Sequence, residues 1–117
     1  MKKSIMILLM LAFFTVNAQQ KQNKITEIKF TVRGNCESCK KRIENAADIK
    51  GVKFAQWDAK TQKIVVTFRH DKTNEKTIKE AILSSGHDVE SDKAPDASYS
   101  KLPACCKFRE GQCTENK

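Results

Sequence analysis

The sequence lacks the features of several large protein classes. One Trp, one Tyr and six Phe are spread over 117 residues, too few to form the stacking surface with which many proteins bind single-stranded nucleic acid. No Ser-His-Asp set, carboxylate pair or glycine-rich phosphate loop can be identified, so we do not expect an enzyme. No internal repeat is present, and no apolar run reaches the roughly 20 residues that a membrane-spanning helix needs.

The first 18 residues predict a secretory signal peptide. Lys2 and Lys3 precede an apolar run over residues 5–16, and the small residue Ala18 ends the segment. The run is too short to cross a bilayer, which favours a cleaved signal over a membrane anchor. We therefore expect a periplasmic or secreted protein with no stable membrane insertion after cleavage.

The exported chain, from residue 19 onward, is basic. Without Lys2 and Lys3, 20 of the 22 Lys and Arg residues remain against 14 Asp and Glu, a net charge of +6. The Lys residues occur in every segment and are mixed with acidic residues, which is typical of solvated faces. After export, nucleic acid is not an expected partner.

Alternating and helical spacing of apolar residues predicts a small α+β domain. The predicted order is strand 24–32, helix 38–49, strand 52–57, strand 64–69, a helix from the Asn74 cap to Gly86, and strand 87–90. Right-handed crossovers would fold these elements into the ferredoxin-like βαββαβ sandwich, a four-stranded antiparallel sheet with both helices on one face. Residues 19–23 are then a leader, 24–91 the domain, and 92–117 an irregular Cys-containing tail in which Tyr99 and Leu102 pack back.

A Cys-x-x-Cys pair, Cys36 and Cys39, lies at the first strand-to-helix junction. The helix N-terminus and the nearby cations Arg33, Lys40, Lys41 and Arg42 favour the thiolate form of both residues. Thiolates select soft ions such as Cu(I). A structural zinc site needs four ligands, and no second motif at suitable spacing accompanies this pair. Two sulfurs suffice for Cu(I), so an open copper site fits better.

These residues resemble the heavy-metal-associated domain family, which includes small copper chaperones and the periplasmic mercury-binding protein. The resemblance spans about residues 24–91 and rests on the segments at 34–39, 43–44, 51–52 and 85–89. It implies that Cys36 and Cys39 carry Cu(I), or Hg(II), Zn(II) or Cd(II), to another metal-binding or membrane transport protein. Where the family usually has Met two residues before the first Cys, this chain has Gly34. That difference predicts a more mobile loop.

Additional ligands can be suggested among the remaining His and Cys residues. His87 lies in the loop expected to face the pair, where it is either a third ligand or a surface residue that shapes the loop; His70 is expected at the opposite end of the sheet. Cys105 and Cys106 either supply extra thiolates or form a disulfide, with Cys113 or, under strain, with each other.

Three functions remain open on the sequence alone. The first is an exported carrier or buffer of a soft metal ion. The second is a thiol–disulfide redox protein that uses the same Cys pair, although it lacks a Pro between the cysteines and has a different element order from thioredoxin-like proteins. The third is a secreted interaction module whose cysteines are bridged.

Overall fold

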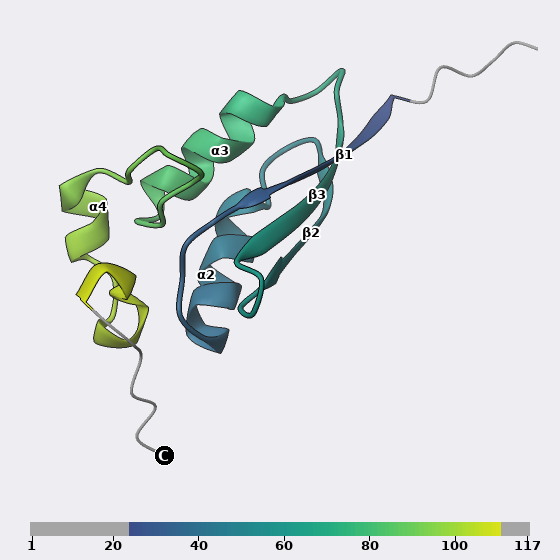
Figure 1. Ribbon diagram of the computed structural model, residues 1–117. Coiled ribbons are helices and arrows are strands. Elements are labelled where there is room, and N and C mark those ends of the chain that lie inside the picture. Colours follow the sequence, from purple (N-terminus) through teal and green to yellow (C-terminus); the bar gives the residue numbers. More distant parts are fainter. Residues whose placement is uncertain (1–23, 111–117) are drawn as a thin grey trace, which may run out of the picture.

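The computed structural model describes residues 24–110 (Figure 1). The predicted signal peptide, the leader 19–23 and Cys113 lie outside the described residues. Within residues 24–110, no helix combines the length and apolar character needed to span a bilayer.

Three antiparallel strands form the sheet: β1 (Ile25–Thr31), β2 (Val52–Asp58) and β3 (Lys63–Arg69), in the order β1-β3-β2. The register pairs Ile28 with Val66 across β1 and β3, and Trp57 with Ile64 across β2 and β3. Side chains at alternate positions of β3 are buried, as the period of two predicts. The hairpin between β2 and β3 thereby fixes Trp57, which is 1 % exposed, in the core.

Two helices, α2 (Glu37–Ala47) and α3 (Glu75–Ser84), cover one face of this sheet (Figure 1). The inward side of α2 carries Cys39, Ile43 and Ala47, all fully buried. The Asn74 side chain accepts a 2.8 Å hydrogen bond from the Thr77 N–H and so caps α3, as predicted. The α+β architecture with both helices on one face is confirmed.

The predicted fourth strand, residues 87–90, is reduced to an isolated bridge between Val32 and Val89. The Arg33 N–H donates to the Asp88 carbonyl at 2.9 Å, and the Glu90 N–H to the Thr31 carbonyl at 2.9 Å. Glu90 then takes a left-handed conformation, with φ of 51°, and reverses the chain. Pairing stops after one bridge for this reason, and the prediction of four strands is wrong within residues 24–110.

Residues 92–110, here called the C-terminal extension, are more ordered than the predicted irregular tail. They contain α4 (Asp96–Ser100) and two short 3₁₀ turns, η2 (Ala104–Cys106) and η3 (Phe108–Glu110). The buried side chains of the extension are Ala94, Tyr99, Leu102, Cys106 and Phe108. The extension packs at the end of the domain where α2 begins (Figure 1).

Gly86 allows this close packing. Its φ is +103°, the left-handed conformation expected for a glycine after a helix. A Cβ at this position would lie 2.8 Å from the Ser98 carbonyl oxygen and 3.0 Å from Leu102 Cγ. A side chain here would therefore push the extension away from α3.

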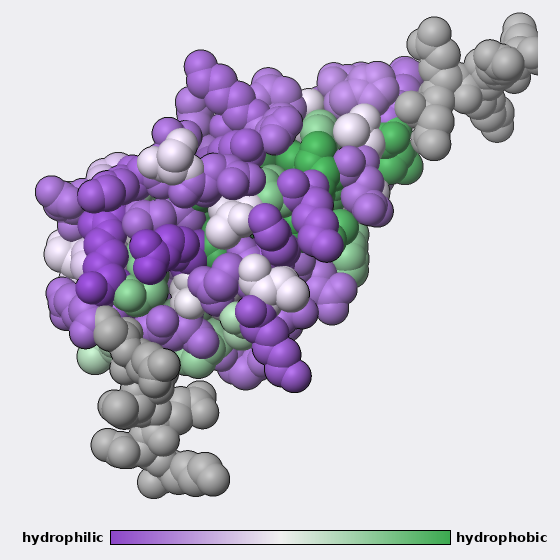
Figure 2. Space-filling view, viewed as in Figure 1, coloured by the Kyte–Doolittle hydropathy of each residue, from purple (hydrophilic) through white to green (hydrophobic). Residues whose placement is uncertain are grey.

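The surface is hydrophilic over most of the face in Figure 2, with a hydrophobic cluster beside β1. Ile25 and Phe54 are the large apolar side chains that are exposed in residues 24–110. Basic side chains on the helices pair with acidic neighbours, as Lys79 does with Glu75 at 2.9 Å. Such exposed pairs contribute little stability, and they agree with the interpretation of the charge as solvated.

Candidate metal centre

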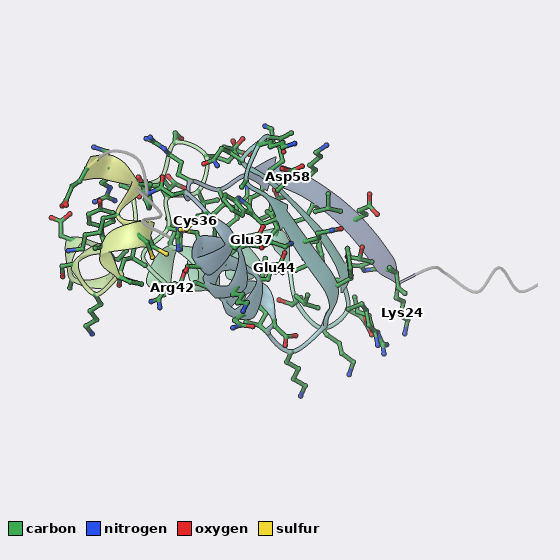
Figure 3. The ribbon with its side chains drawn as sticks, turned by 90° about the horizontal axis from the view of Figure 1, so that it is seen from below. Lys24, Cys36, Glu37, Arg42, Glu44 and Asp58 are labelled. Carbon is green, nitrogen blue, oxygen red and sulfur yellow. The ribbon has the colours of Figure 1, made fainter. Side chains whose placement is uncertain are left out.

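Cys36 occupies the N-cap position of α2. Its backbone is extended, with φ of −147° and ψ of −171°, and no side chain caps this end of the helix. The Cys36 carbonyl accepts the first helical hydrogen bond, from the Lys40 N–H at 3.0 Å. The N–H groups at a helix N-terminus carry partial positive charge, which favours an ionised sulfur at this point. Cys36 is half-buried and lies at the end of α2 that faces the extension (Figure 3).

Cys39 lies in the first turn of α2 and is fully buried in the core. The two members of the pair therefore differ in access: Cys36 is within reach of a partner, whereas Cys39 is covered.

The loop before the pair is firmly held from the β2–β3 side. The Trp57 indole N–H donates to the Val32 carbonyl at 2.8 Å, and the Gly34 N–H donates to the Gln62 side chain at 3.0 Å. A Cβ on Gly34 would lie 3.0 Å from Cys39 Cβ and 3.1 Å from the Trp57 ring. The Trp57 ring thus fills the space beside the loop, and the greater mobility of the loop stays a prediction.

The opposite side of the loop contacts His87. Its Nδ1 lies 2.7 Å from the Arg33 carbonyl oxygen, which can only accept, so Nδ1 carries the proton. The other ring nitrogen, Nε2, is buried and has no hydrogen-bond partner among the described residues. Burial, reinforced by the charge of Arg42, lowers the pKa of His87 against the opposing effects of the Arg33 carbonyl and Asp88. The imidazole is therefore neutral, with a lone pair on Nε2 that could bind a metal.

The cations expected around the pair are partly engaged elsewhere. Lys40 forms an ion pair with Glu44 and donates to the Trp57 carbonyl at 3.1 Å. Arg33 lies over the Phe108 ring, 5.5 Å from its centroid. Lys40 is thus paired with Glu44, and Arg33 with the Phe108 ring, so neither cation is free to act on the pair alone.

The extension brings Cys105 and Cys106 to the same region. The Cys105 carbonyl oxygen accepts from the Asn35 side-chain amide at 3.2 Å and lies 3.9 Å from the Cys36 sulfur. The sulfurs of Cys105 and Cys106 are 3.9 Å apart. Cys106 is fully buried, and burial, together with hydrogen bonding to the thiols of Cys39 and Cys105, raises its pKa. Cys106 is therefore a protonated thiol in the metal-free protein.

No disulfide joins the four cysteines of residues 24–110. Within this part of the chain, no group of three or more His, Cys, Asp and Glu side chains is arranged to hold a metal ion. The structure thus brings the two predicted pairs, Cys36 with Cys39 and Cys105 with Cys106, into one region without surrounding a common point. The role of His87 as a ligand stays a prediction, and pairing with Cys113 lies outside the described residues.

Sequence reasoning missed the residues that hold the extension in place. Asp88 is buried and binds Arg109, and Asn35 binds the Cys105 carbonyl. A signal for this packing was available, since Tyr99, Leu102 and Cys106 are spaced by three and four residues, the period of a buried helical face. That spacing predicts a folded extension, although it does not identify the partners.

Comparison with known proteins agrees with this geometry. The family model of the heavy-metal-associated domain matches residues 29–88, just over half of the chain. The chain belongs to the heavy-metal-associated domain family. This is a family of metal-binding domains rather than of enzymes. No curated protein matches the sequence.

Solved structures show the same fold. This heavy-metal-associated domain is similar to a CopZ metallochaperone, with a TM-score of 0.53 and 29% identity, over 55% of this chain and 98% of that one. It is equally similar to a copper binding domain from HMA7, a P-type ATPase, with a TM-score of 0.53 and 29% identity, over 55% of this chain and 89% of that one. Oxidized MerP from Ralstonia metallidurans CH34 shares the fold, with a TM-score of 0.51 and 24% identity, over 57% of this chain and 99% of that one.

The family match ends at residue 88, so the extension lies outside it. The part within the match contains Cys36, Cys39 and His87, whereas Cys105 and Cys106 lie beyond it. This protein therefore combines a heavy-metal-associated domain with an extension that carries a second pair of cysteines.

Proposed function

We propose that this protein is an exported carrier or buffer of Cu(I). It binds the ion through the sulfurs of Cys36 and Cys39 and transfers it to another metal-binding or membrane transport protein. The observation that carries this proposal is the placement of Cys36 at the N-cap of α2 with Cys39 one turn into the helix. In a domain of this family, that placement puts two sulfurs at the positive end of a helix.

The chemistry of the pair favours Cu(I) over harder ions. Two thiolates and one Cu(I) have a net charge of −1, which the helix N-terminus stabilises. Zinc in a structural site takes four ligands, whereas Cu(I) can be held by the two sulfurs of this pair. Hg(II) or Cd(II) could occupy the same sulfurs. The neutral Nε2 of His87 is a candidate third ligand.

The similar proteins support a copper cargo. Two relatives with 29% identity and the same fold are a CopZ metallochaperone and a copper binding domain of a P-type ATPase. The likeness to MerP, at 24% identity, supports the fold alone. Export rests on the predicted signal peptide of residues 1–18, so the cargo would be handled in the periplasm or outside the cell.

The competing function is thiol–disulfide exchange by the same pair. It is favoured by one observation, the half-buried Cys36 at a helix N-terminus, which is also the position of a reactive thiolate in redox proteins. Metal transfer is preferred because the fold is that of metal-binding domains.

A competition assay tests the proposal. The protein without residues 1–18, fully reduced, is mixed with one equivalent of Cu(I) and a competing chelator. We expect the wild type to retain the ion and Cys36→Ser to lose it, whereas the matched control Ser38→Ala, an exposed position on the same turn, retains it. Retention by Cys36→Ser would reject the site. Reduction of insulin disulfides without metal retention would favour the redox function.

A further inference from the structure

The C-terminal extension is attached to the domain at Asp88. The Arg109 guanidinium donates to both carboxylate oxygens, at 2.5 and 3.3 Å, and the Ala94 N–H donates to one of them at 2.8 Å. Asp88 adjoins His87, whose ring stacks on Phe108 with centroids 5.7 Å apart. The segment between the last helix of the family domain and the extension is thus held by both charge and aromatic packing.

The interior of the extension is organised around Tyr99. Its hydroxyl accepts from the Arg109 N–H at 3.1 Å, and the Arg109 guanidinium lies 4.2 Å from its ring centroid. The Tyr99 ring also meets the Phe108 ring edge-on at 5.3 Å. Arg109 therefore links the fold of the extension to its attachment at Asp88, so that the extension docks as a unit.

The docked extension places Cys105 and Cys106 beside Cys36 and Cys39. Asn35, directly before Cys36, donates to the Cys105 carbonyl at 3.2 Å. Cys106 is fully buried, and its sulfur interacts with those of Cys39 and Cys105. The 3₁₀ turn at residues 104–106 thus lies beside both members of the pair: the Cys105 carbonyl is 3.9 Å from the Cys36 sulfur, and Cys106 is next to the buried Cys39.

We propose that the C-terminal extension is a lid that contributes Cys105 and Cys106 to the metal site, so that a docked lid holds one Cu(I) with more than two sulfurs. This proposal rests on the proposed binding of metal by Cys36 and Cys39. Opening the lid at the Asp88–Arg109 ion pair leaves a two-sulfur site from which the ion can pass to a partner.

The chemistry of the additional ligands is simple. Each thiol that binds Cu(I) releases its proton to solvent and donates a lone pair, with no change in oxidation state. Because no group of three ligands in residues 24–110 is already arranged around an ion, the thiols must turn their side chains when the ion arrives. Metal binding therefore strengthens the docking of the lid, since the ion connects α2 to the extension.

A plain packing role for Cys106 is the competing explanation. A buried Cys commonly behaves as a small apolar residue, and one placed on a docked helical turn would be covered in any case. Packing alone predicts that Cu(I) has only two sulfur ligands and that the lid cysteines have no effect on its retention.

The deciding experiment counts the sulfurs around Cu(I) by X-ray absorption at one equivalent of metal. All variants carry Cys113→Ser, so that any additional sulfur must come from Cys105 or Cys106, and only monomeric fractions are measured, so that no second molecule contributes. We expect more than two sulfurs in this background and two after Cys105→Ala and Cys106→Ala are added. The matched control, Ala104→Ser on the same turn, keeps the higher count.

A chelator competition on the same samples gives the second measurement. We expect the loss of both lid cysteines to weaken Cu(I) retention by about tenfold or more, a loss typical of removing groups that support a metal site. A count of two sulfurs in the Cys113→Ser background would overturn the lid proposal and leave the proposed function intact. Retention of Cu(I) by Cys36→Ser at the wild-type level would instead overturn the proposed function itself. The count in this background decides the question even if the double Ala variant fails to fold.

Discussion

Arg109 and Asp88 form a two-point ion pair that joins the C-terminal extension to the family domain. Burial alone would raise the pKa of Asp88, but hydrogen bonds from Arg109 and the Ala94 N–H, with the charges of Arg109 and Arg33, hold it below its usual value. The same contact raises the pKa of Arg109. The pair is therefore charged on both sides at neutral pH and acts as the latch of the extension.

Arg109→Gln is expected to open this latch. The variant leaves the Asp88 carboxylate buried without its cation, which costs well over the roughly 1.4 kcal/mol that corresponds to a tenfold change in an equilibrium. We predict that Cys106 of the metal-free protein reacts with a thiol reagent at least about tenfold faster, as measured by mass spectrometry of labelled peptides.

Lys101→Gln is the matched control for the latch, because Lys101 is an exposed cation of the same extension. It removes the same charge without touching Asp88, so labelling of Cys106 should stay at the wild-type rate. Equal labelling rates for Arg109→Gln and the wild type would contradict the role of the ion pair.

Gly34→Ala is expected to destabilise the domain. The added Cβ would lie 3.0 Å from Cys39 Cβ and 3.1 Å from the Trp57 ring, closer than ordinary packing allows. Overpacking of this kind costs about 1–3 kcal/mol, which urea unfolding of the metal-free protein would reveal as a lower midpoint. Ser38→Ala, at an exposed helix position, should change stability by no more than about 0.5 kcal/mol.

Stability of the metal-free protein should fall in mild acid because of His87. Its pKa is lowered in the folded state from the ordinary value of 6.5, so below that pH the unfolded chain binds more protons than the folded one. The stabilisation is complete above about pH 6.5 and is lost as the pH falls toward the folded pKa. Thermal unfolding at a series of pH values would show this decline.

His87→Gln should flatten the pH dependence, whatever its effect on stability at neutral pH, because Gln does not titrate. The control His70→Gln changes an exposed residue in the same way and should keep the decline. A decline that persists in His87→Gln would assign it to other groups.

His87→Ala also tests the predicted third ligand. If Nε2 binds the ion, the variant should retain Cu(I) modestly less well than the wild type against a chelator, and His70→Ala should behave as the wild type. Unchanged affinity would reject His87 as a ligand and leave its ring as packing for Phe108.

Local patterns predicted most of the domain. Alternation located the first and third strands, apolar and aromatic residues after Gly51 located the second, and the Asn74 cap marked the start of α3 within one residue. The fourth strand failed because its end depends on Glu90, a residue with no strong preference for the left-handed conformation that it adopts. The sequence indicated that Val89 faces inward, but it did not indicate how many residues around Val89 pair with the neighbouring strand.

Long-range packing limited the prediction of the site. Nothing in the sequence places the Trp57 ring beside Gly34, which lies 23 residues earlier in the chain. Likewise, the ion pair of Asp88 with Arg109 joins residues 21 positions apart through a chain reversal. Such contacts follow from the assembled fold and not from any local spacing.

The binding of Cu(I) by Cys36 and Cys39 is tested most directly by the Cβ chemical shifts of all five cysteines in the isotope-labelled protein. One equivalent of Cu(I), added under reducing conditions, should move the Cβ signals of both Cys36 and Cys39. Signals of these two residues that stay in place while the ion is bound elsewhere would contradict the account.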